Sequence, residues 1–501
     1  MSDAVTASAK GATFLILVQI VSKALTFAMN QLLLRHLSPA LLGASVQLEL
    51  YKIGVLYFSR ESLRVATERR SPAGVQAAVN LSYLALLAGV PIGLGFAQWY
   101  LHVGPPDVPW FVVALRINGI AAVVELLSEP AYVTVQQKML FKIRAAAEVP
   151  GVMVKTTTIA AVVFWSQRKG VDLGVLPFAV GELANSATLT LLYLYQTSQV
   201  AKQERFSLFP RKLKLRCVRG LICASSLLFK PLLRLSASLY FQTGIKWALT
   251  EGDKLLVAAF ASLEAQGMYA LSANYGGFLA RMVFKPIEDT IRNLFANLCA
   301  APDPKSSTNI APSPKPHPNI STASHTLRRT LRLYTTLSLP IFALGPHAFP
   351  LILKILAGSR WTHAGAAPVF AAYSYYIPLL ALNGVTEAFV AATASTADLR
   401  RQSLWMGLFS ALFAGSAWLF LRVLDTGARG LVWANCLNMS LRIVFNLAFC
   451  RDFLARHDVR FDILDIVPGA SALAGAAVVP SLLGRLVEVQ WLHSYGLWGE
   501  L

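Results

Sequence analysis

Charged and amide side chains recur at helical spacing inside apolar segments of this sequence, where such residues are costly. Between residues 266 and 299, polar residues stand at i, +7, +11, +14 and +18, which places them on one face of a helix. That face carries Asn274, Arg281, Lys285, Glu288 and Arg292. Its cations outnumber its anions, and the planar fork of arginine can donate two parallel hydrogen bonds to a phosphate. The chemistry that this face predicts is the binding of an anionic group.

Similar polar stripes occur in other apolar segments. They comprise Gln19, Lys23, Thr26 and Asn30; Glu49, Lys52, Arg60 and Arg64; Lys246, Thr250 and Asp253; Asn383 and Glu387; and Asn435, Asn438, Arg442 and Asn446. Such residues can simply join helices, and opposite charges can pair. A purely structural network would be expected to balance its charges, whereas these stripes carry an excess of cations. We therefore expect them to line a polar interior that receives an anionic substrate.

The composition explains which elements must position these residues. The chain has 501 residues, of which 55% are hydrophobic and 14% are charged, whereas a soluble domain has about 25% charged residues. Its long apolar stretches can span a bilayer, where the backbone must bond internally. This predicts an all-α, polytopic membrane protein. The formal net charge of +19 is then better explained by basic cytosolic loops than by binding of nucleic acid.

Thirteen candidate spans follow from the apolar pattern. They are 12–34, 40–59, 73–100, 109–129, 145–165, 174–197, 236–262, 266–299, 327–356, 365–394, 402–421, 427–450 and 463–483. The first is too long for a signal-peptide core, and we expect it to be retained. Residues 485–501 are too short for a convincing further span. The prediction is therefore 13–14 transmembrane helices.

Loop charges predict the orientation and the division of the chain. With the N-terminus in the cytosol, the cytosolic loops carry roughly three times as many Lys and Arg residues as the opposite loops. We expect a six-helix lobe over 1–197, a basic cytosolic linker over 198–235, and a second six-helix lobe over 236–450. The second lobe includes a Pro- and Ser-rich, disordered cytosolic loop at 300–326, and 451–501 adds a helix and a tail. Two such lobes would enclose a central cavity.

Other chemistry finds little support in the sequence. The five cysteines form no C-x-x-C pair, and no zinc, P-loop or dinucleotide motif is present. We expect no catalytic residues, no metal and no cofactor. Four aromatic residues in the second lobe could stack on sugars or could simply pack in the membrane. They are Tyr275, Tyr373, Tyr375 and Tyr376.

Eight short blocks, in the same order along the chain, resemble the Rft family of eukaryotic dolichol-linked oligosaccharide translocation proteins. They include Leu-Leu-Arg-His-Leu-Ser at 33–38, Arg60-Glu61 with Arg64, Glu-Leu-Leu-Ser-Glu-Pro at 125–130 and Leu-Thr-Glu-Gly-Asp-Lys at 249–254. The remaining blocks lie at 266–269, 280–289, 382–389 and 434–443. The resemblance covers most of the chain, from the first span to about Cys450.

The resemblance implies a multi-pass protein of the endoplasmic reticulum membrane that acts in N-glycosylation. It implies translocation of dolichyl-pyrophosphate carrying five mannoses and two N-acetylglucosamines, from the cytosolic to the lumenal leaflet. The family is similar to bacterial lipid-linked precursor flippases, which have two lobes, a central cavity and about fourteen helices. The partners implied are this glycolipid and membrane lipids; the sequence leaves the oligomeric state open.

The resemblance and the polar stripes together give the candidate site. For substrate binding we select the basic residues Lys23, Arg35, Arg60, Arg64, Lys155, Arg281, Lys285 and Arg442. Of these, Arg60 and Arg64 lie near the cytosolic mouth and are expected to receive the head group. Four acidic residues are expected to pair with these cations when the substrate is absent. They are Glu61, Glu251, Glu288 and Glu387. Lys23 stands where related chains have arginine, which removes bidentate phosphate binding at that position.

Two other functions stay open at this stage. A cation- or proton-coupled exporter of small molecules could use a similar two-lobe fold, but would favour an anionic cavity. A non-transporting support factor of the N-glycosylation machinery would tolerate charge reversal in the cavity. A membrane glycosyltransferase is disfavoured, because the sequence has no D-x-D motif and no long lumenal loop for a catalytic domain.

Overall fold

The computed structural model describes residues 29–31, 33–68, 74–204, 206–216, 222–279, 284–299 and 318–488. The predicted first span, 12–34, therefore lies mostly outside the described residues, as do Lys23 and Arg281. The chain separates into two compact units, Met1–Leu255 and Leu256–Leu501. Each predicted span from the second onward overlaps a described helix.

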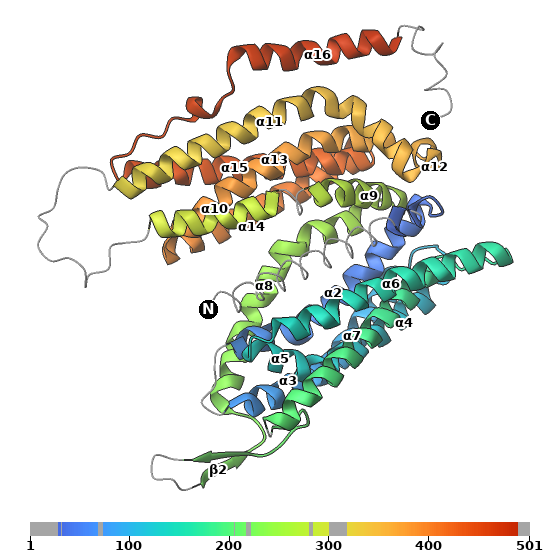
Figure 1. The fold of residues 1–501 in the computed structure, drawn as a ribbon. Helices are drawn as coiled ribbons and strands as arrows, with labels where there is room; N and C mark the ends of the chain where they lie inside the picture. Colours follow the sequence, from blue (N-terminus) through green and yellow to red (C-terminus); the bar gives the residue numbers. More distant parts are fainter. Residues whose placement is uncertain are drawn as a thin grey trace, which may run out of the picture. The chain divides into compact units, whose positions relative to one another are not determined.

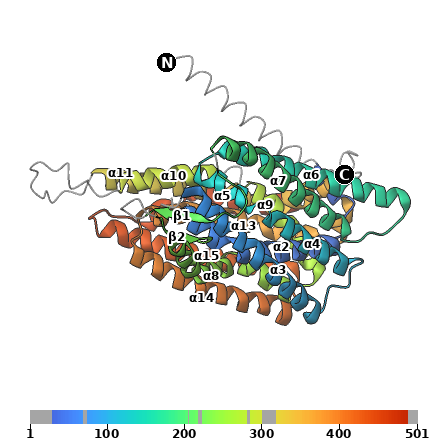
Figure 2. The same ribbon diagram turned by 90° about the horizontal axis from the view of Figure 1, so that it is seen from below.

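Unit 1 is built mainly from long helices (Figure 1). They are α2 (Pro39–Glu68), α3 (Gly74–Val103), α4 (Phe111–Leu126), α5 (Glu129–Gln137), α6 (Phe141–Lys169), α7 (Leu176–Gln203) and α8 (Lys230–Phe260), whose last turn passes into unit 2. Within this unit α2, α3 and α4 pack against one another, and α7 packs on both α4 and α6 (Figure 2). Small residues permit the close approach, since Ala77, Ala78, Ala114 and Ala121 are fully buried at these contacts.

The predicted span 109–129 corresponds to α4, and a break separates α4 from the short helix α5, which extends the segment to Gln137. The two helices meet at an angle of 43° and together are apolar enough for one membrane crossing. Pro130 lies in the first turn of α5, where its missing N–H removes no helical hydrogen bond. Ser128 in the break donates its hydroxyl to the carbonyl of Glu125 at 2.7 Å. The break sets Glu125 at the end of α4 and Glu129 at the start of α5.

The linker predicted at 198–235 contains a short antiparallel hairpin, which the sequence analysis did not foresee. Its strands are β1 (Leu213–Arg216) and β2 (Ile222–Ser226). The side chain of Asn80 on α3 holds the base of the hairpin, donating to the carbonyls of Arg211 and Leu227 at 2.6 Å each. It also accepts from the backbone N–H of Arg211 at 3.1 Å. Asn80 docks the linker on α3 together with Gln76 and Tyr83, which hydrogen-bond the backbone of residues 207–209.

Unit 2 contains the remaining helices. They are α9 (Leu263–Leu279), α10 (Lys285–Leu298), α11 (Pro318–Ala357), α12 (Ser359–His363), α13 (Ala366–Thr393), α14 (Thr396–Trp418), the π-helix η2 (Leu419–Val423), α15 (Ala428–Ala455), the 3-10 helix η3 (Ile463–Ile466) and α16 (Ala470–Glu488). Within the unit, α13 packs between α11 and α15 and is the most buried of these helices (Figure 1). Apolar residues from several helices fill the core, and Phe295, Leu327 and Phe389 are fully buried there.

Two boundaries in unit 2 differ from those predicted. Helix α11 begins at Pro318, within the range 300–326 that the sequence analysis assigned to a disordered loop. The last span begins at Ala470 rather than at 463. Its delayed start has a local cause, because Pro468 disfavours a helical conformation for the preceding residue. Val467 is accordingly extended, with φ −69° and ψ 130°.

The described helices include many that can cross a membrane. Six are long and apolar enough on their own, and the bent pair of α4 and α5 makes a seventh within the described part of the chain. Helices α2 and α7 have similar lengths, 30 and 28 residues, but they carry more charged and polar side chains. Those side chains form the first candidate site.

Candidate anion-translocation site

Seven charged residues of unit 1 form a continuous series of ion pairs, which we call the ladder. In spatial order they are Lys155, Glu182, Lys52, Glu125, Arg60, Glu129 and Arg64. Cations and anions alternate, and each carboxylate lies between two cations. The ladder therefore has a cation at both ends and carries a formal charge of +1.

Helix α2 supplies three of the four cations. Lys52, Arg60 and Arg64 are spaced eight and four residues apart, so they lie within a 120° arc and span about 18 Å along the helix. Lys52 Nζ lies 3.0 Å from Glu125 Oε2 and 2.8 Å from Glu182 Oε2. It also donates to the hydroxyl of Ser186 at 2.9 Å. All three polar partners of this ammonium come from other helices.

The break between α4 and α5 places two carboxylates opposite the two arginines. Glu125 and Glu129 are four residues apart, as are Arg60 and Arg64. Arg60 Nη1 donates to Glu125 Oε1 at 2.9 Å and to Glu129 Oε1 at 3.1 Å. Arg64 holds both oxygens of Glu129, with its Nε 2.9 Å from Oε2. Its guanidinium also lies over the ring of Tyr132, 3.6 Å from the centroid.

The other end of the ladder depends on close packing of α6 and α7. Lys155 on α6 forms an ion pair with Glu182 on α7. Gly181 precedes this glutamate, and a β-carbon there would collide with Ile159 and approach the carbonyl oxygen of Lys155 to 3.1 Å. A glycine at this position thus lets the two helices come close enough for the ion pair.

Burial distinguishes the members of the ladder. Lys52 and Glu129 are 5% and 1% exposed, whereas the side chain of Lys155 is 30% exposed. Removing one partner of a buried ion pair costs about 3–5 kcal/mol, because an uncompensated charge remains. The residues at the centre of the ladder are therefore held in place by the cost of separating buried ion pairs. Lys155 is the ladder cation most accessible to another anion.

A second group of polar residues lies between α13 and α15 in unit 2, and we call it the polar cluster. It consists of Asn383, Thr386, Glu387, Arg442 and Asn446. Arg442 Nη2 lies 3.2 Å from Glu387 Oε2, and Asn383 donates to the same oxygen at 2.9 Å. The side chains of Arg442 and Glu387 are 28% and 38% exposed. This ion pair is more open than the ladder.

Helix α10 contributes two predicted site residues beside the polar cluster. The carboxylate of Glu288 lies against Gly384 of α13, where a β-carbon would displace it. Lys285 pairs with Asp289 on the same helix at 3.2 Å, and both side chains are about half exposed. Among the described residues, the ion pair that holds Lys285 is this exposed one within its own helix.

The other predicted residues lie apart from these groups. Arg35 is an exposed residue just before α2. Glu251 pairs with Lys254 on α8, 2.7 Å away, and not with an arginine. Glu61 forms no ion pair with any described residue, although it neighbours Arg60 in sequence. The carboxylates that hold Arg60 and Arg64 are Glu125 and Glu129.

Sequence reasoning missed three acidic residues and one lysine as members of the site. Glu125 and Glu129 belong to the block at 125–130, where their spacing of four residues inside an apolar stretch was a usable signal. Glu182 is an isolated carboxylate in a predicted span, and a buried carboxylate requires a cationic partner. Lys52 appeared in a polar stripe of α2 but was not selected.

The four tyrosines considered for sugar stacking pack against other aromatic rings in unit 2. Tyr375 stacks between Phe342 and Trp433, with centroids 5.9 and 5.6 Å away. Tyr373 and Tyr376 are buried and contact each other edge to face, and Tyr275 meets the ring of Phe370. The geometry thus favours packing for these residues.

The arrangement provides guanidinium and ammonium groups inside helical bundles, and these groups bind anions. Within the described residues, no group of three or more His, Cys, Asp or Glu side chains could hold a metal ion. The polar cluster offers a partly exposed arginine whose carboxylate partner an incoming phosphate could replace. The ladder offers the same chemistry at Lys155.

Comparison of the sequence with known proteins identifies close similarity to one family. The family model described as Rft protein matches residues 7–494. A protein of Yarrowia lipolytica named Man(5)GlcNAc(2)-PP-dolichol translocation protein RFT1 is 34% identical over 97% of this chain and 76% of its own length. The protein of the same name from Saccharomyces cerevisiae is 32% identical, over 89% of this chain and 83% of its own length.

Comparison of the structure with solved structures identifies a shared fold. The lipid II flippase MurJ in an inward closed conformation has a TM-score of 0.61 at 13% identity, covering 95% of this chain and 93% of its own. An inward-facing multidrug resistance MATE family transporter has a TM-score of 0.56 at 10% identity, covering 87% and 95%. At such identities the likeness shows the fold alone. The fold is that of an all-helical, multi-pass membrane protein, as predicted.

Proposed function

Because this chain belongs to the Rft protein family, we propose that it moves Man5GlcNAc2-PP-dolichol from the cytosolic to the lumenal leaflet of the endoplasmic reticulum membrane. The observation that carries this proposal is the match to the named translocation proteins along nearly the whole chain. The activity is transport of a glycolipid rather than catalysis. It would supply the precursor for N-glycosylation in the lumen.

The substrate's chemistry explains why such a protein is needed. Each hydroxyl or amide that enters hydrocarbon without a hydrogen-bonding partner costs several kcal/mol. A pyrophosphate carrying seven sugars has many such groups and would cross an unassisted bilayer very slowly. Alternating access of two lobes around a polar interior removes most of this cost. We assign the two lobes to 1–197 and 236–450, with the N-terminus in the cytosol.

We assign the pyrophosphate contacts to the accessible cations. In unit 2, Arg442 is partly exposed and is held by a single carboxylate, Glu387. A phosphate that displaces Glu387 would gain charge-assisted hydrogen bonds from the guanidinium. In unit 1, Lys155 is the exposed end of the ladder. The predicted contacts of Lys23, Arg35, Arg281 and Lys285 belong to the same proposal.

The structure changes the role that we propose for the two arginines of the ladder. Arg60 and Arg64 already form ion pairs with Glu125 and Glu129. They can receive a head group only if α2 separates from α4 and α5. Their proposed contact with substrate is therefore restricted to a state in which the helices of unit 1 have rearranged.

The test uses purified full-length protein in liposomes that contain a short-chain dolichyl-pyrophosphate oligosaccharide. An external lectin reports how much glycan reaches the outer leaflet. We expect the wild type to expose inner-leaflet glycan, and Arg442→Gln to slow this at least about tenfold, the effect of losing roughly 1.4 kcal/mol of binding. Arg451→Gln, an exposed arginine on the same helix, should transport at the wild-type rate.

Two results would change the conclusion. If folded wild-type protein leaves the inner glycan inaccessible, direct translocation is wrong, and a supporting role in N-glycosylation takes its place. If transport proceeds but needs an ion gradient and accepts small cations, an exporter on the same fold is the better description. Equal rates for Arg442→Gln and wild type would remove Arg442 from the substrate path and leave translocation itself intact.

A further inference from the structure

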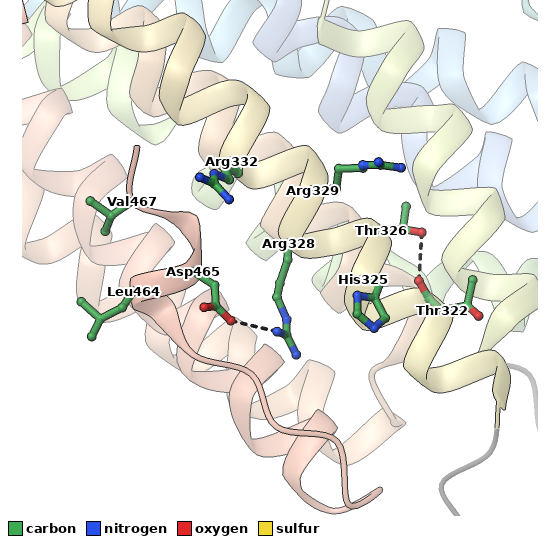
Figure 3. Close-up of a pocket in the computed structure, with 9 residues that line it drawn as sticks. All are labelled: Thr322, His325, Thr326, Arg328, Arg329, Arg332, Leu464, Asp465 and Val467. Carbon is green, nitrogen blue, oxygen red and sulfur yellow. Dashed lines mark hydrogen bonds and ion pairs between the residues drawn. The ribbon is translucent and has the colours of Figure 1, made fainter. Parts of the chain in front are cut away.

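A basic pocket lies in unit 2, on helix α11 where it passes η3 (Figure 3). The pocket has a volume of about 830 Å³. Helix α11 lines it with His325, Arg328, Arg329 and Arg332, and the η3 segment adds Leu464 and Asp465. None of these residues belongs to the ladder or to the polar cluster. The proposed translocation path therefore makes no use of the pocket.

The charges in this pocket are not balanced. Arg328 Nη1 lies 2.8 Å from Asp465 Oδ2, and its other Nη donates to the carbonyl of Arg460. This arginine ties α11 to the segment before α16 (Figure 3). Arg329 and Arg332 are exposed and form no ion pair with any described residue. With Arg328 neutralised by Asp465, the pocket retains two positive charges.

A second, apolar cavity of about 220 Å³ adjoins the basic pocket. Its walls include Leu331, Leu382, Leu447 and Ile466, and it borders the polar cluster at Thr386. Val467 lines both cavities, so the two lie next to each other along the same segment. A cationic compartment next to an apolar one matches an amphiphile with an anionic head and a hydrocarbon chain.

The length of α11 sets the depth of this double cavity. The helix has 40 residues and is about 60 Å long, roughly twice the hydrocarbon thickness of a bilayer. Part of it must therefore lie outside the hydrocarbon. Its first turns are the polar part, and they hold His325 to Arg332. The basic pocket thus lies at the level of lipid head groups, with the apolar cavity on the hydrocarbon side.

We propose that this double cavity binds one anionic phospholipid of the surrounding leaflet, as a lipid that stays bound rather than one that is transported. Arg329 and Arg332 hold its phosphate and any further negative group, because arginine donates several hydrogen bonds to phosphate oxygens. One acyl chain enters the apolar cavity beside Leu331 and Leu447. Since Arg328 with Asp465 forms the wall, a bound lipid would brace α11 against η3.

The experiment measures lipid binding by native mass spectrometry on delipidated full-length protein in detergent. The probes are phosphatidylinositol, phosphatidylcholine and inorganic phosphate. We expect one phosphatidylinositol to bind at least about tenfold more tightly than phosphatidylcholine, which has the same phosphate but no net charge. Arg329→Gln with Arg332→Gln should abolish this preference. The matched control is Arg400→Gln with Arg401→Gln, which removes the same charge from exposed positions on α14 and should leave it unchanged.

The apolar cavity provides the test that separates a lipid from a free anion. Leu447→Phe puts a larger side chain into that cavity and reduces its empty volume without altering any charge. It should weaken phosphatidylinositol binding severalfold. If Leu447→Phe has no effect and inorganic phosphate displaces the lipid, the pocket is a soluble-phosphate site and the proposal is wrong. Equal affinity for the two phospholipids, or equal losses in both arginine double variants, would also overturn it.

Discussion

The two units of this protein differ in how the charged residues between their helices are paired and how exposed they are. In the ladder of unit 1, four cations and three carboxylates saturate one another, and most of them are buried. In the polar cluster of unit 2, a single ion pair between Glu387 and Arg442 is partly exposed and is supported by amides. Both arrangements place an arginine between helices. Only the second leaves that arginine accessible without moving a helix.

This difference teaches that a cation inside a membrane protein is not by itself a ligand-binding residue. The excess of cations on polar stripes indicated anion binding, yet most of the excess in unit 1 is cancelled by carboxylates from other helices. A saturated network fixes helix positions, because every displacement breaks a buried pair. An open pair can exchange its carboxylate for a substrate phosphate at small cost. Stability and function should therefore respond differently to substitutions in the two regions.

The largest effect is expected for Glu129→Gln in the ladder. This change removes the carboxylate that pairs with Arg64, which is also one of the two carboxylates that pair with Arg60. We expect a loss of about 3–5 kcal/mol in the free energy of unfolding, since a buried charge loses its partner. Thermal unfolding of purified protein in detergent measures it. Glu387→Gln is the comparison in unit 2 and should cost less than about 1 kcal/mol; similar losses in both would contradict the distinction.

A medium effect is expected where α6 approaches α7. Gly181→Ala would force its β-carbon against Ile159 and the backbone of Lys155, and overpacking of this kind costs about 1–3 kcal/mol. In unit 2, the atoms nearest to a β-carbon at Gly384 belong to the flexible side chain of Glu288, which can rotate away at smaller cost. The same unfolding measurement ranks the two variants. A larger loss for Gly384→Ala would show that Glu288 is held as rigidly as the ladder.

A smaller value is expected for the coupling energy between Glu387 and Arg442, which a double-mutant cycle measures. Their side chains are more than a quarter exposed, and exposed pairs have coupling energies of about 0.2–1 kcal/mol. The same cycle on Glu129 and Arg64 should give a coupling energy of up to about 3 kcal/mol. Unfolding midpoints of the single and double variants supply both values. Equal coupling energies would mean that the polar cluster is as structural as the ladder.

The smallest effect is expected for Lys285→Gln. Lys285 pairs with Asp289 on its own helix, and both side chains are about half exposed. Such a change should alter stability by no more than about 0.5 kcal/mol. Glycan translocation in liposomes should still slow if Lys285 contacts substrate, as we propose. Unchanged transport would remove Lys285 from the candidate site and leave Arg442 as the main cation tested in unit 2.

Much of the fold was predictable because apolar length and helix periodicity are local properties of the chain. The prediction of an all-helical, polytopic membrane protein is confirmed, as is the prediction of the family. The hairpin at 213–226 was not predicted, since it depends on Asn80 of α3 and no strand pattern marks it. The start of α11 was placed too late because the Pro- and Ser-rich composition extends into its first turns.

The site was predictable by residue type but not by partner. Arg60, Arg64 and Arg442 were selected because charged residues in apolar segments stand out, and Lys155 because it matches a basic position of the family. Their ion-pair partners come from other helices, up to 69 positions away in sequence, and periodicity does not tell which helices face each other. Glu182 was missed for this reason. The roles assigned to the selected residues stay predictions until transport is measured.

The ladder also constrains how this sequence can change over generations. Each of its three carboxylates forms ion pairs with two cations, so the loss of one carboxylate leaves two cations with fewer partners. A neutral residue in place of Lys52 would leave Glu125 paired with Arg60 alone and Glu182 paired with Lys155 alone. Exchange of a basic residue for an acidic one would require its neighbours to follow. In related chains we expect these seven positions to vary together or to stay fixed, while Glu387 and Arg442 vary as a simple pair.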